Sequence, residues 1–227
     1  MDVTPDTSPP VADSSELPHK YVGGDPSVDF VNTVDWTGRG LVDERLDSYA
    51  RLTHWAEGAG VVPASLGAVL RDAARMRPAA AAEALAAAHA ARGVLQRAFA
   101  SAAAGQPLGI ELDALDPYLA AAARRRCHRP AADATAGGAA VRWAWREAGA
   151  HLESPLWPVV WHAAELLASH DVARVRVCGA ADCGWMYVDR SRNGLRRWCQ
   201  MEVCGTRAKS RRRADRLRTA QQGRQAR

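Results

Sequence analysis

The chain of 227 residues is poor in several features that mark common protein classes. It has two phenylalanines, two lysines and no apolar run near the length of about 20 residues that a membrane-spanning helix needs. The N-terminal stretch MDVTPDTSPPVADSSELP lacks the basic-then-apolar pattern of a secretion signal. These absences give no reason to expect a membrane partner and predict a cytoplasmic protein, in which thiols stay reduced.

The sequence also lacks the short motifs that mark common catalytic sites. It has no nucleophile elbow, no glycine-rich phosphate loop and no HExxH. Five histidines are scattered without the spacing of metal ligands: His54, His89, His128, His151 and His162. We therefore expect no enzyme, and an enzymatic or ligand-storing N-terminal domain with a structural C-terminal cap is kept as an alternative.

Cysteine is scarce but concentrated. Four of the five cysteines follow the spacing C-x4-C-x15-C-x4-C: Cys178, Cys183, Cys199 and Cys204. Two close pairs separated by a loop suit a tetrahedral ion, and soft thiolates favour zinc over Mg²⁺ or Ca²⁺. Because no histidine lies in residues 171–227, we predict one structural zinc held by four thiolates, with paired disulfides or an iron–sulfur cluster as alternatives. Cys127 is expected to be a buried small hydrophobe.

Charge is distributed unevenly along the chain. Residues 1–173 hold 15 basic and 21 acidic residues, a net of −6, whereas residues 174–227 hold 15 basic and 4 acidic residues, a net of +11. A preference for arginine over lysine fits a GC-rich genome, but codon bias does not place half of the basic residues in the last quarter. The basic end predicts a nucleic-acid partner.

The pattern of apolar residues predicts a mainly α fold. Residues 1–18 are expected to be disordered because they are rich in Pro, Ser, Asp and Thr. A helical domain is expected over residues 19–170, with a short β element where VRWAWR alternates over residues 141–146. The side chains of Val141, Trp143 and Trp145 should form its half-buried face. Helices are predicted over residues 47–57, 63–75, 78–104, 108–126 and 154–169.

The C-terminal part predicts a second, smaller unit over residues 171–218. RVRV at residues 174–177 and WMYV at residues 185–188 alternate as two short strands around the first cysteine pair. The stretch TRAKSRRRADRLRTAQQ, residues 206–222, lacks Gly and Pro and is expected to form a basic helix with too few apolar residues to pack a core. Residues 219–227 are expected to be a disordered tail.

The segment CGAADCGWMYVDRSRNGLRRWCQMEVCGTRAKSRRR resembles the CGNR-type zinc finger. Tyr187, Asp189 and Ser191 match its aromatic-x-Asp-x-Ser element, and the run from Arg196 to Met201 matches its Arg-Arg-Trp-Cys-x-Met stretch. The signature Cys-Gly-Asn-Arg reads Cys-Gly-Thr-Arg here, with Thr206 in place of Asn. Threonine can still cap the following helix. The resemblance implies a treble-clef-like finger with four cysteine ligands and a basic helix at its end.

Upstream, the stretch SVDFVNT at residues 27–33, followed by Leu46, Tyr49, Leu52 and Trp55, is similar to the ABATE domain that is usually joined to this finger. Such proteins are described as stress-induced transcription regulators. The resemblance implies that the helical domain senses a signal or mediates assembly.

Nucleic-acid contact is predicted for the basic residues of the finger loop and the last helix. These residues are Arg190, Arg192, Arg196, Arg197, Arg207, Lys209, Arg211, Arg212, Arg213 and Arg216. The guanidinium fork binds phosphate and also reads guanine in a major groove. A solvated charged surface is the alternative.

Several polar and aromatic residues allow two interpretations. Trp185 and Trp198 either stack on bases or, as we prefer, shield the metal. Asp189 is expected to pair with an arginine or bond the loop backbone and not to read DNA. The SVDFVNT stretch holds either a ligand site or, as we slightly favour, a cluster of turn and cap residues. Six tryptophans suit either plain core packing or a core around a small ligand: Trp36, Trp55, Trp143, Trp145, Trp157 and Trp161.

The leading hypothesis is a zinc-dependent transcription regulator that binds double-stranded DNA. An RNA-binding zinc finger protein is the alternative, and a preference for single strands would distinguish it. A small-molecule ligand in the N-terminal domain and assembly into a homodimer are left open.

Overall fold

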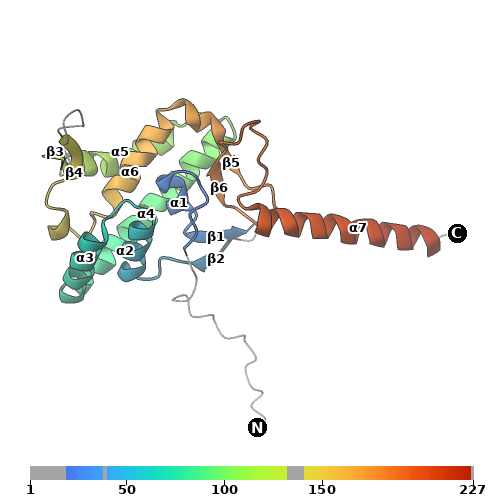
Figure 1. Cartoon of the computed structure of the whole chain (residues 1–227), viewed down its shortest axis with the longest axis horizontal. Coiled ribbons are helices and arrows are strands. Elements are labelled where there is room, and N and C mark those ends of the chain that lie inside the picture. The colour runs from blue at the N-terminus through green and yellow to red at the C-terminus, as the bar shows by residue number, and fades with distance from the viewer. Residues whose placement is uncertain (1–18, 38–39, 132–140, 226–227) are drawn as a thin grey trace, which may run out of the picture.

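We analysed a computed structural model that describes residues 19–37, 40–131 and 141–225 (Figure 1). The predicted disorder of residues 1–18 lies outside these ranges. None of the helices described here has the length and apolar character needed to cross a membrane.

The prediction of a mainly α fold is confirmed. The α-helices are α1 Pro26–Val31, α2 Tyr49–Gly58, α3 Ala64–Met76, α4 Pro78–Ala103, α5 Gly109–Ala123, α6 Leu156–Leu167 and α7 Thr206–Gln225. The strands form three antiparallel pairs, β1 Val34–Thr37 with β2 Gly40–Glu44, β3 Arg126–Pro130 with β4 Val141–Trp145, and β5 Val175–Val177 with β6 Met186–Val188.

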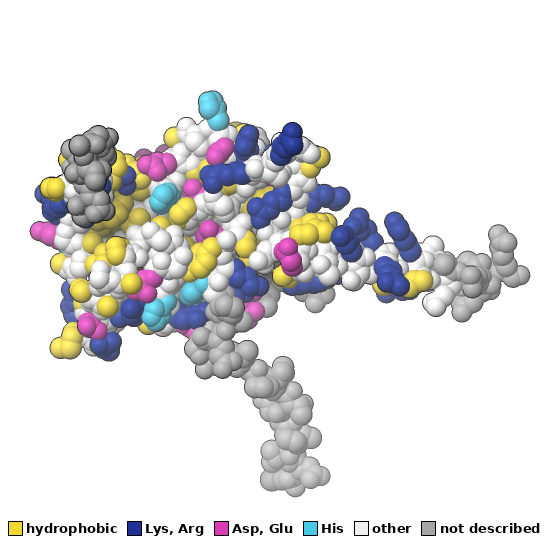
Figure 2. All heavy atoms as spheres, viewed as in Figure 1, with side chains coloured by type: hydrophobic (Ala, Val, Ile, Leu, Met, Phe, Trp, Pro, Cys, Tyr) yellow, Lys and Arg dark blue, Asp and Glu magenta, His cyan; other side chains and the backbone are white. Residues whose placement is uncertain are grey.

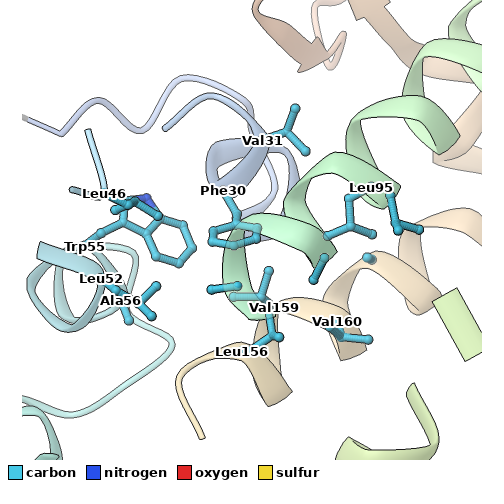
Figure 3. Close-up of a cluster of buried hydrophobic side chains, with 14 of the residues drawn as sticks. Phe30, Val31, Leu46, Leu52, Trp55, Ala56, Leu95, Leu156, Val159 and Val160 are labelled. Atoms are coloured by element: carbon cyan, nitrogen blue, oxygen red, sulfur yellow. The ribbon is translucent and has the colours of Figure 1, made fainter. Parts of the chain in front are cut away.

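The alanine-rich helix α4 runs through the middle of the helical domain, where α1, α2, α3 and α5 pack against it, and α6 packs against α1 and α5 (Figure 1). Small side chains on its buried faces let the neighbouring helices approach closely, while Leu95 and Phe99 fill the remaining space and are fully buried. Trp55 from α2 and Phe30 from α1 meet with ring centroids 5.1 Å apart (Figure 3). The core thus joins the start of the chain to its middle.

Helix boundaries agree with local capping chemistry. The Ser48 side chain accepts a hydrogen bond from the Arg51 N–H at the start of α2, and the Asp25 side chain accepts one from the Ser27 N–H at the start of α1. These bonds satisfy N–H groups that lack a partner within the helix. The predicted helices over residues 47–57, 78–104 and 154–169 each appear with both ends within two residues of the prediction.

The hairpin β3–β4 differs from the prediction in two ways. Residues 126–130, predicted in part as helix, form a strand that pairs with β4 from Arg126–Trp145 to Pro130–Val141. The expected half-buried face of β4 is wrong for Val141 and Trp143, whose side chains are 53% and 56% exposed, whereas Trp145 is half-buried as predicted. The hairpin lies at one end of the domain (Figure 1), and the ring centroids of Trp143 and His128 lie 4.1 Å apart.

The last helix is longer than predicted. Helix α7 continues to Gln225, so the prediction of a disordered tail is wrong for residues 219–225, whereas residues 226–227 lie outside the described ranges. Alanine, arginine and glutamine all have high helix propensity, and no proline interrupts the run. The helix projects away from the rest of the molecule (Figure 1).

The C-terminal unit is built into the helical domain. Val175, Met186 and Val188, from β5 and β6, belong to the same buried core as α1, α4 and α6. The Asn32 side chain donates to the Met186 carbonyl and accepts from the Met186 N–H, both at 2.8 Å, and so pairs with β6 as a further strand would. The Trp185 indole donates to the Val34 carbonyl at 3.0 Å. The finger is therefore held rigidly against α1 and β1.

This pairing predicts the effect of Asn32→Ala. The substitution leaves both polar groups of Met186 buried without a partner, so the free energy of unfolding should fall by about 2–4 kcal/mol. Thermal and urea unfolding of the zinc-loaded protein would measure the loss. Asn193→Ala, the same change at an exposed loop position of the finger, is the control and should stay within about 0.5 kcal/mol. Equal stability of the two variants would contradict the role of Asn32.

Candidate metal centre and basic helix

Two short turns carry the four cysteines. In the first, residues 178–183, the Cys178 N–H donates to the Trp185 carbonyl at 2.8 Å and the Cys183 N–H donates to the Ala180 carbonyl at 3.1 Å. In the second, residues 199–204, the Cys204 N–H donates to the Gln200 carbonyl at 3.0 Å. The wide turn at Met201–Gly205 then runs directly into α7. We call these segments the first and second knuckle.

The knuckles bring the four sulfur atoms together. All four lie within 4.8 Å of one another, with Sγ–Sγ distances of 3.7 Å for Cys183–Cys199 and 3.6 Å for Cys199–Cys204. A tetrahedral zinc with bonds of about 2.3 Å requires sulfur atoms about 3.8 Å apart. Cys178, Cys199 and Cys204 are buried, and Cys183 is half-buried. The sulfur positions therefore fit one structural zinc ion, the closed type of site that holds a fold together.

The protonation behaviour of these thiols also favours a cation. Hydrogen bonds from Cys183 and Cys199 lower the pKa of the Cys178 thiol, while hydrogen bonding to Cys178 raises the pKa of the other two. In the absence of a cation, the three neighbouring thiols cannot all lose their protons, because the resulting thiolates would repel each other. A divalent ion offsets this repulsion and stabilises all four thiolates. Cys127 lies in β3, away from the cluster.

Aromatic residues cover the side of the metal centre that faces the protein interior. Trp185 and Tyr187 are buried, and together with three of the cysteines they form a separate small core against which Trp198 packs. The Trp185 ring is further covered by Arg45, whose guanidinium carbon lies 5.4 Å from the ring centroid. The burial of Trp185 agrees with the preferred interpretation of a shield, whereas Trp198 is half-buried beside the cysteines.

Asp189 organises the loop between the knuckles. Its buried carboxylate accepts hydrogen bonds from the N–H and hydroxyl of Ser191, at 2.9 and 2.6 Å, and from the Arg196 N–H at 3.1 Å. These hydrogen bonds lower the pKa of Asp189 against the opposing effect of desolvation. The expectation that Asp189 bonds the loop backbone is confirmed.

The ten predicted nucleic-acid residues fall into distinct structural groups. Arg196 donates to the carbonyls of Val22, Trp198 and Cys199 at 3.0, 3.0 and 2.5 Å, and lies 4.1 Å over the Tyr187 ring. It therefore ties the N-terminal segment to the second knuckle. Arg190 donates to the Gly24 carbonyl at 2.6 Å and pairs with Asp171 at 3.3 Å.

The basic residues of α7 lie on two faces. Lys209, Arg212, Arg213 and Arg216 follow the spacing i, i+3, i+4, i+7, which places them on one face. We call these four residues the outer stripe. All four are exposed, and within the part of the chain that the structure describes they make no ion pair or side-chain hydrogen bond. Arg211 and Arg218 share a different face and pair with Asp182 and Asp215.

The stripe extends a positively charged surface that begins on the finger. Lys and Arg side chains gather over the finger and along α7 (Figure 2). Arg192 is exposed in the finger loop, and the Arg197 guanidinium lies 5.4 Å from the Trp198 ring centroid. At the start of α7 the hydroxyl of Thr206 donates to the Met201 carbonyl at 3.3 Å, so in this structure it bonds a carbonyl and does not cap an N–H.

The segment of residues 22–24 ahead of α1, which we call the strap, links the finger to the helical domain through polar contacts. The buried Asp29 carboxylate accepts the Gly23 N–H at 2.7 Å, and the Gly23 carbonyl accepts the Val188 N–H at 2.7 Å. A Cβ at Gly23 would lie 2.9 Å from the Asp29 nitrogen, so only glycine fits there. Burial raises the pKa of Asp29 to about 6 against the lowering effect of the N–H groups.

The polar residues of SVDFVNT thus have structural partners. Asp29 holds the strap and Asn32 holds β6, while the Thr33 hydroxyl donates to the Phe30 carbonyl at 2.6 Å and accepts from Arg92 at 2.9 Å. These contacts agree with the turn-and-cap interpretation and extend it, because two of the three residues reach the finger. No pattern in the sequence indicated that Asn32 would pair with a strand 154 residues away.

The fold and the sulfur cluster define a helical protein that ends in a four-cysteine zinc finger. Residues 174–217 match the CGNR zinc finger, and residues 24–170 match the ABATE family, described as "Putative stress-induced transcription regulator". The second match covers more than half of the 227 residues, so the chain belongs to the ABATE family. A search of the curated proteins found no match.

The metal centre leads to a first prediction for this site. Protein purified under reducing conditions should contain about one zinc per chain, and Cys204→Ser should lose it because three thiolates leave the structural site open. Elemental analysis and thiol titration would measure the metal. Because β5 and β6 belong to the main core, chelation should also lower the melting temperature of the helical domain. Cys127→Ser is the control and should retain the zinc; a metal-free protein with a folded finger would contradict the assignment.

Asp29 predicts a dependence of stability on pH. Its pKa of about 6 in the folded protein exceeds the value of about 3.9 in an unfolded chain, so the ionised carboxylate costs stability at neutral pH. This cost begins to fall as the pH drops through about 6 and is gone below about 4, where the unfolded chain is protonated too. Relative to Asp29→Asn, the unfolding free energy of the natural protein should rise by about 1 kcal/mol between pH 7.5 and pH 5. Urea unfolding in excess zinc would test this, and parallel pH profiles would contradict it.

Proposed function

We propose that the protein is a transcription regulator that binds double-stranded DNA through the zinc finger and α7. The observation that carries this proposal is the outer stripe, a row of four exposed basic residues that make no ion pair or side-chain hydrogen bond with other described residues. A charged surface that serves only solubility gains from mixed signs, whereas this stripe has one sign. Membership in a family described as transcription regulators supports the same conclusion.

The shape of α7 suits a duplex. It is 20 residues long, polar on all sides and projects away from the rest of the molecule. A helix of this kind lacks the apolar face that would hold it against a protein core. Its diameter fits the major groove of B-DNA, which is about 12 Å wide. The stripe from Lys209 to Arg216 spans about 10 Å along the helix, a length over which several phosphates or base edges lie within reach.

The aromatic residues favour duplex over single-stranded nucleic acid. Binding of single strands without sequence preference depends on aromatic side chains on which bases stack. Trp185 is buried and bonded to the Val34 carbonyl, and Tyr187 is buried beneath Arg196. Two of the three aromatic residues of the finger are therefore engaged inside the protein, which makes single-stranded RNA the weaker candidate.

The helical domain is proposed to adjust the position of α7. A continuous series of contacts leads from α1 to α7. Asn32, at the end of α1, pairs with β6, and β6 is followed by the loop and the second knuckle that lead into α7. A signal that moves α1 would reach the metal centre through this path. The absence of a known catalytic motif supports a regulatory and not an enzymatic role for the domain.

Salt dependence tests the proposal. Each phosphate neutralised by a basic residue releases counterions, so log affinity should fall with log salt concentration by about 0.9 per contact. Changing Arg212, Arg213 and Arg216 together to Gln should flatten this slope by about two to three and weaken all duplex sequences similarly. Fluorescence anisotropy with a labelled duplex between 50 and 300 mM KCl, roughly the range in which such slopes are resolved, would measure it.

A matched control removes the same charge elsewhere. Arg97, Arg124 and Arg129 are exposed residues of the helical domain, and their joint change to Gln should leave the slope unchanged. Zinc content should equal that of the natural protein in both triple variants. Absence of duplex binding by the zinc-loaded protein at low salt would overturn the proposal, and tighter binding to single-stranded RNA would favour the alternative.

A further inference from the structure

A groove lies between the first knuckle and the start of α7. It has a volume of about 200 Å³ and is lined by Gly179, Ala180, Ala181, Asp182, Arg207, Ala208, Arg211 and Arg212. The walls consist of backbone and very small side chains, which is why space remains there. Three of the lining residues carry a guanidinium, and Asp182 provides the only acid. The groove therefore has the charge and size of a site for a small anion.

The acid in this groove is paired with one of the three arginines. The Asp182 carboxylate accepts a hydrogen bond from Arg211 across 29 residues of sequence. The two side chains remain 50% and 51% exposed, so water and salt screen the pair and it contributes little to folding stability. A carboxylate on a guanidinium is also the nearest equivalent in a protein to a phosphate in the same position, since both offer two oxygens to one planar fork.

We propose that this groove binds one backbone phosphate of duplex DNA, and that Asp182 occupies the place of that phosphate on Arg211 in the free protein. The inference rests on the proposed function and names a contact within it. On binding, the phosphodiester displaces the carboxylate from Arg211, and Arg207 and Arg212 lie beside it as further donors. Asp182 thereby lowers the affinity for the duplex, because the phosphate must first displace its carboxylate from Arg211.

The position of the groove explains why the contact would orient α7. Its floor is the first knuckle, whose cysteines are fixed by the metal, and its wall is the first turns of α7. A phosphate held there fixes the duplex relative to the rigid end of the helix, while the outer stripe, which shares Arg212 with the groove, continues farther along α7. Phosphate contacts of this kind set the register in which other side chains reach base edges.

A double-mutant cycle tests the inference. Asp182→Asn should raise duplex affinity about three- to tenfold near 0.1 M salt and steepen the salt slope by about one, because Arg211 no longer exchanges one anion for another. In an Arg211→Gln background the same Asp182→Asn change should have less than about a twofold effect. Each variant must retain one zinc per chain, which excludes damage to the neighbouring Cys183.

Asp215→Asn is the matched control for charge. Asp215 pairs with Arg218 on the same helix at similar exposure but lies outside the groove. A general effect of removing one negative charge would appear equally in Asp215→Asn and would persist in the Arg211→Gln background. That result, with duplex binding intact, would overturn the role of Asp182 and leave the proposed function standing. Loss of duplex binding in every variant, including the natural sequence, would overturn both.

Filling the groove gives an independent measurement. Ala208→Leu places a larger side chain in the groove and should reduce duplex affinity at least about threefold, whereas Ala214→Leu, outside the groove on the same helix, should not. Equal affinities of the two variants would contradict the groove as a contact. Inorganic phosphate added at constant ionic strength should compete no better than chloride; specific competition would assign the groove to free phosphate and overturn the duplex contact.

Discussion

Four thiolates that converge on one zinc ion set the direction of the basic helix. The second knuckle ends at Gly205 and α7 begins at Thr206, so no flexible linker separates the last metal ligand from the first turn of the helix. A helix with so few apolar residues has no core of its own to hold it in place. The metal site therefore holds α7 in place, as packing against the core holds the other helices. The position of the arginines on α7 thus depends on all four cysteines binding the metal.

The finger gains a second support from the helical domain. Asn32 and Asp29 bond backbone groups of β6 and of the strap, and Arg196 bonds the strap from the finger side. Each of these polar groups is buried or half-buried, where an unpaired partner is costly. The finger and the helical domain thus stabilise each other, and a short series of contacts connects α1 to the metal centre.

The sequence predicted those features whose cause is local. Cysteine spacing indicated the zinc, alternation indicated β5 and β6, and the alanine run indicated α4, because each depends on residues close together in the chain. Strand β4 was predicted from its alternation, but its partner β3 was missed because residues 126–130 follow directly on a helical pattern. Pairing of Asn32 with Met186 depends on two segments 154 residues apart meeting at one edge, and one sequence contains no record of such a contact.

The arginines show most clearly what a structure adds to a charge count. All ten residues were predicted to contact nucleic acid, yet the guanidinium of Arg196 already contacts three carbonyls and an aromatic ring. Arg190 and Arg211 already pair with acids. A residue whose donors are already used must break those bonds before it binds phosphate, and the cost is larger for a half-buried group than for an exposed one. Binding should therefore depend first on the outer stripe, then on exposed pairs that a phosphate can open, and not on Arg196, whose loss would act on the fold.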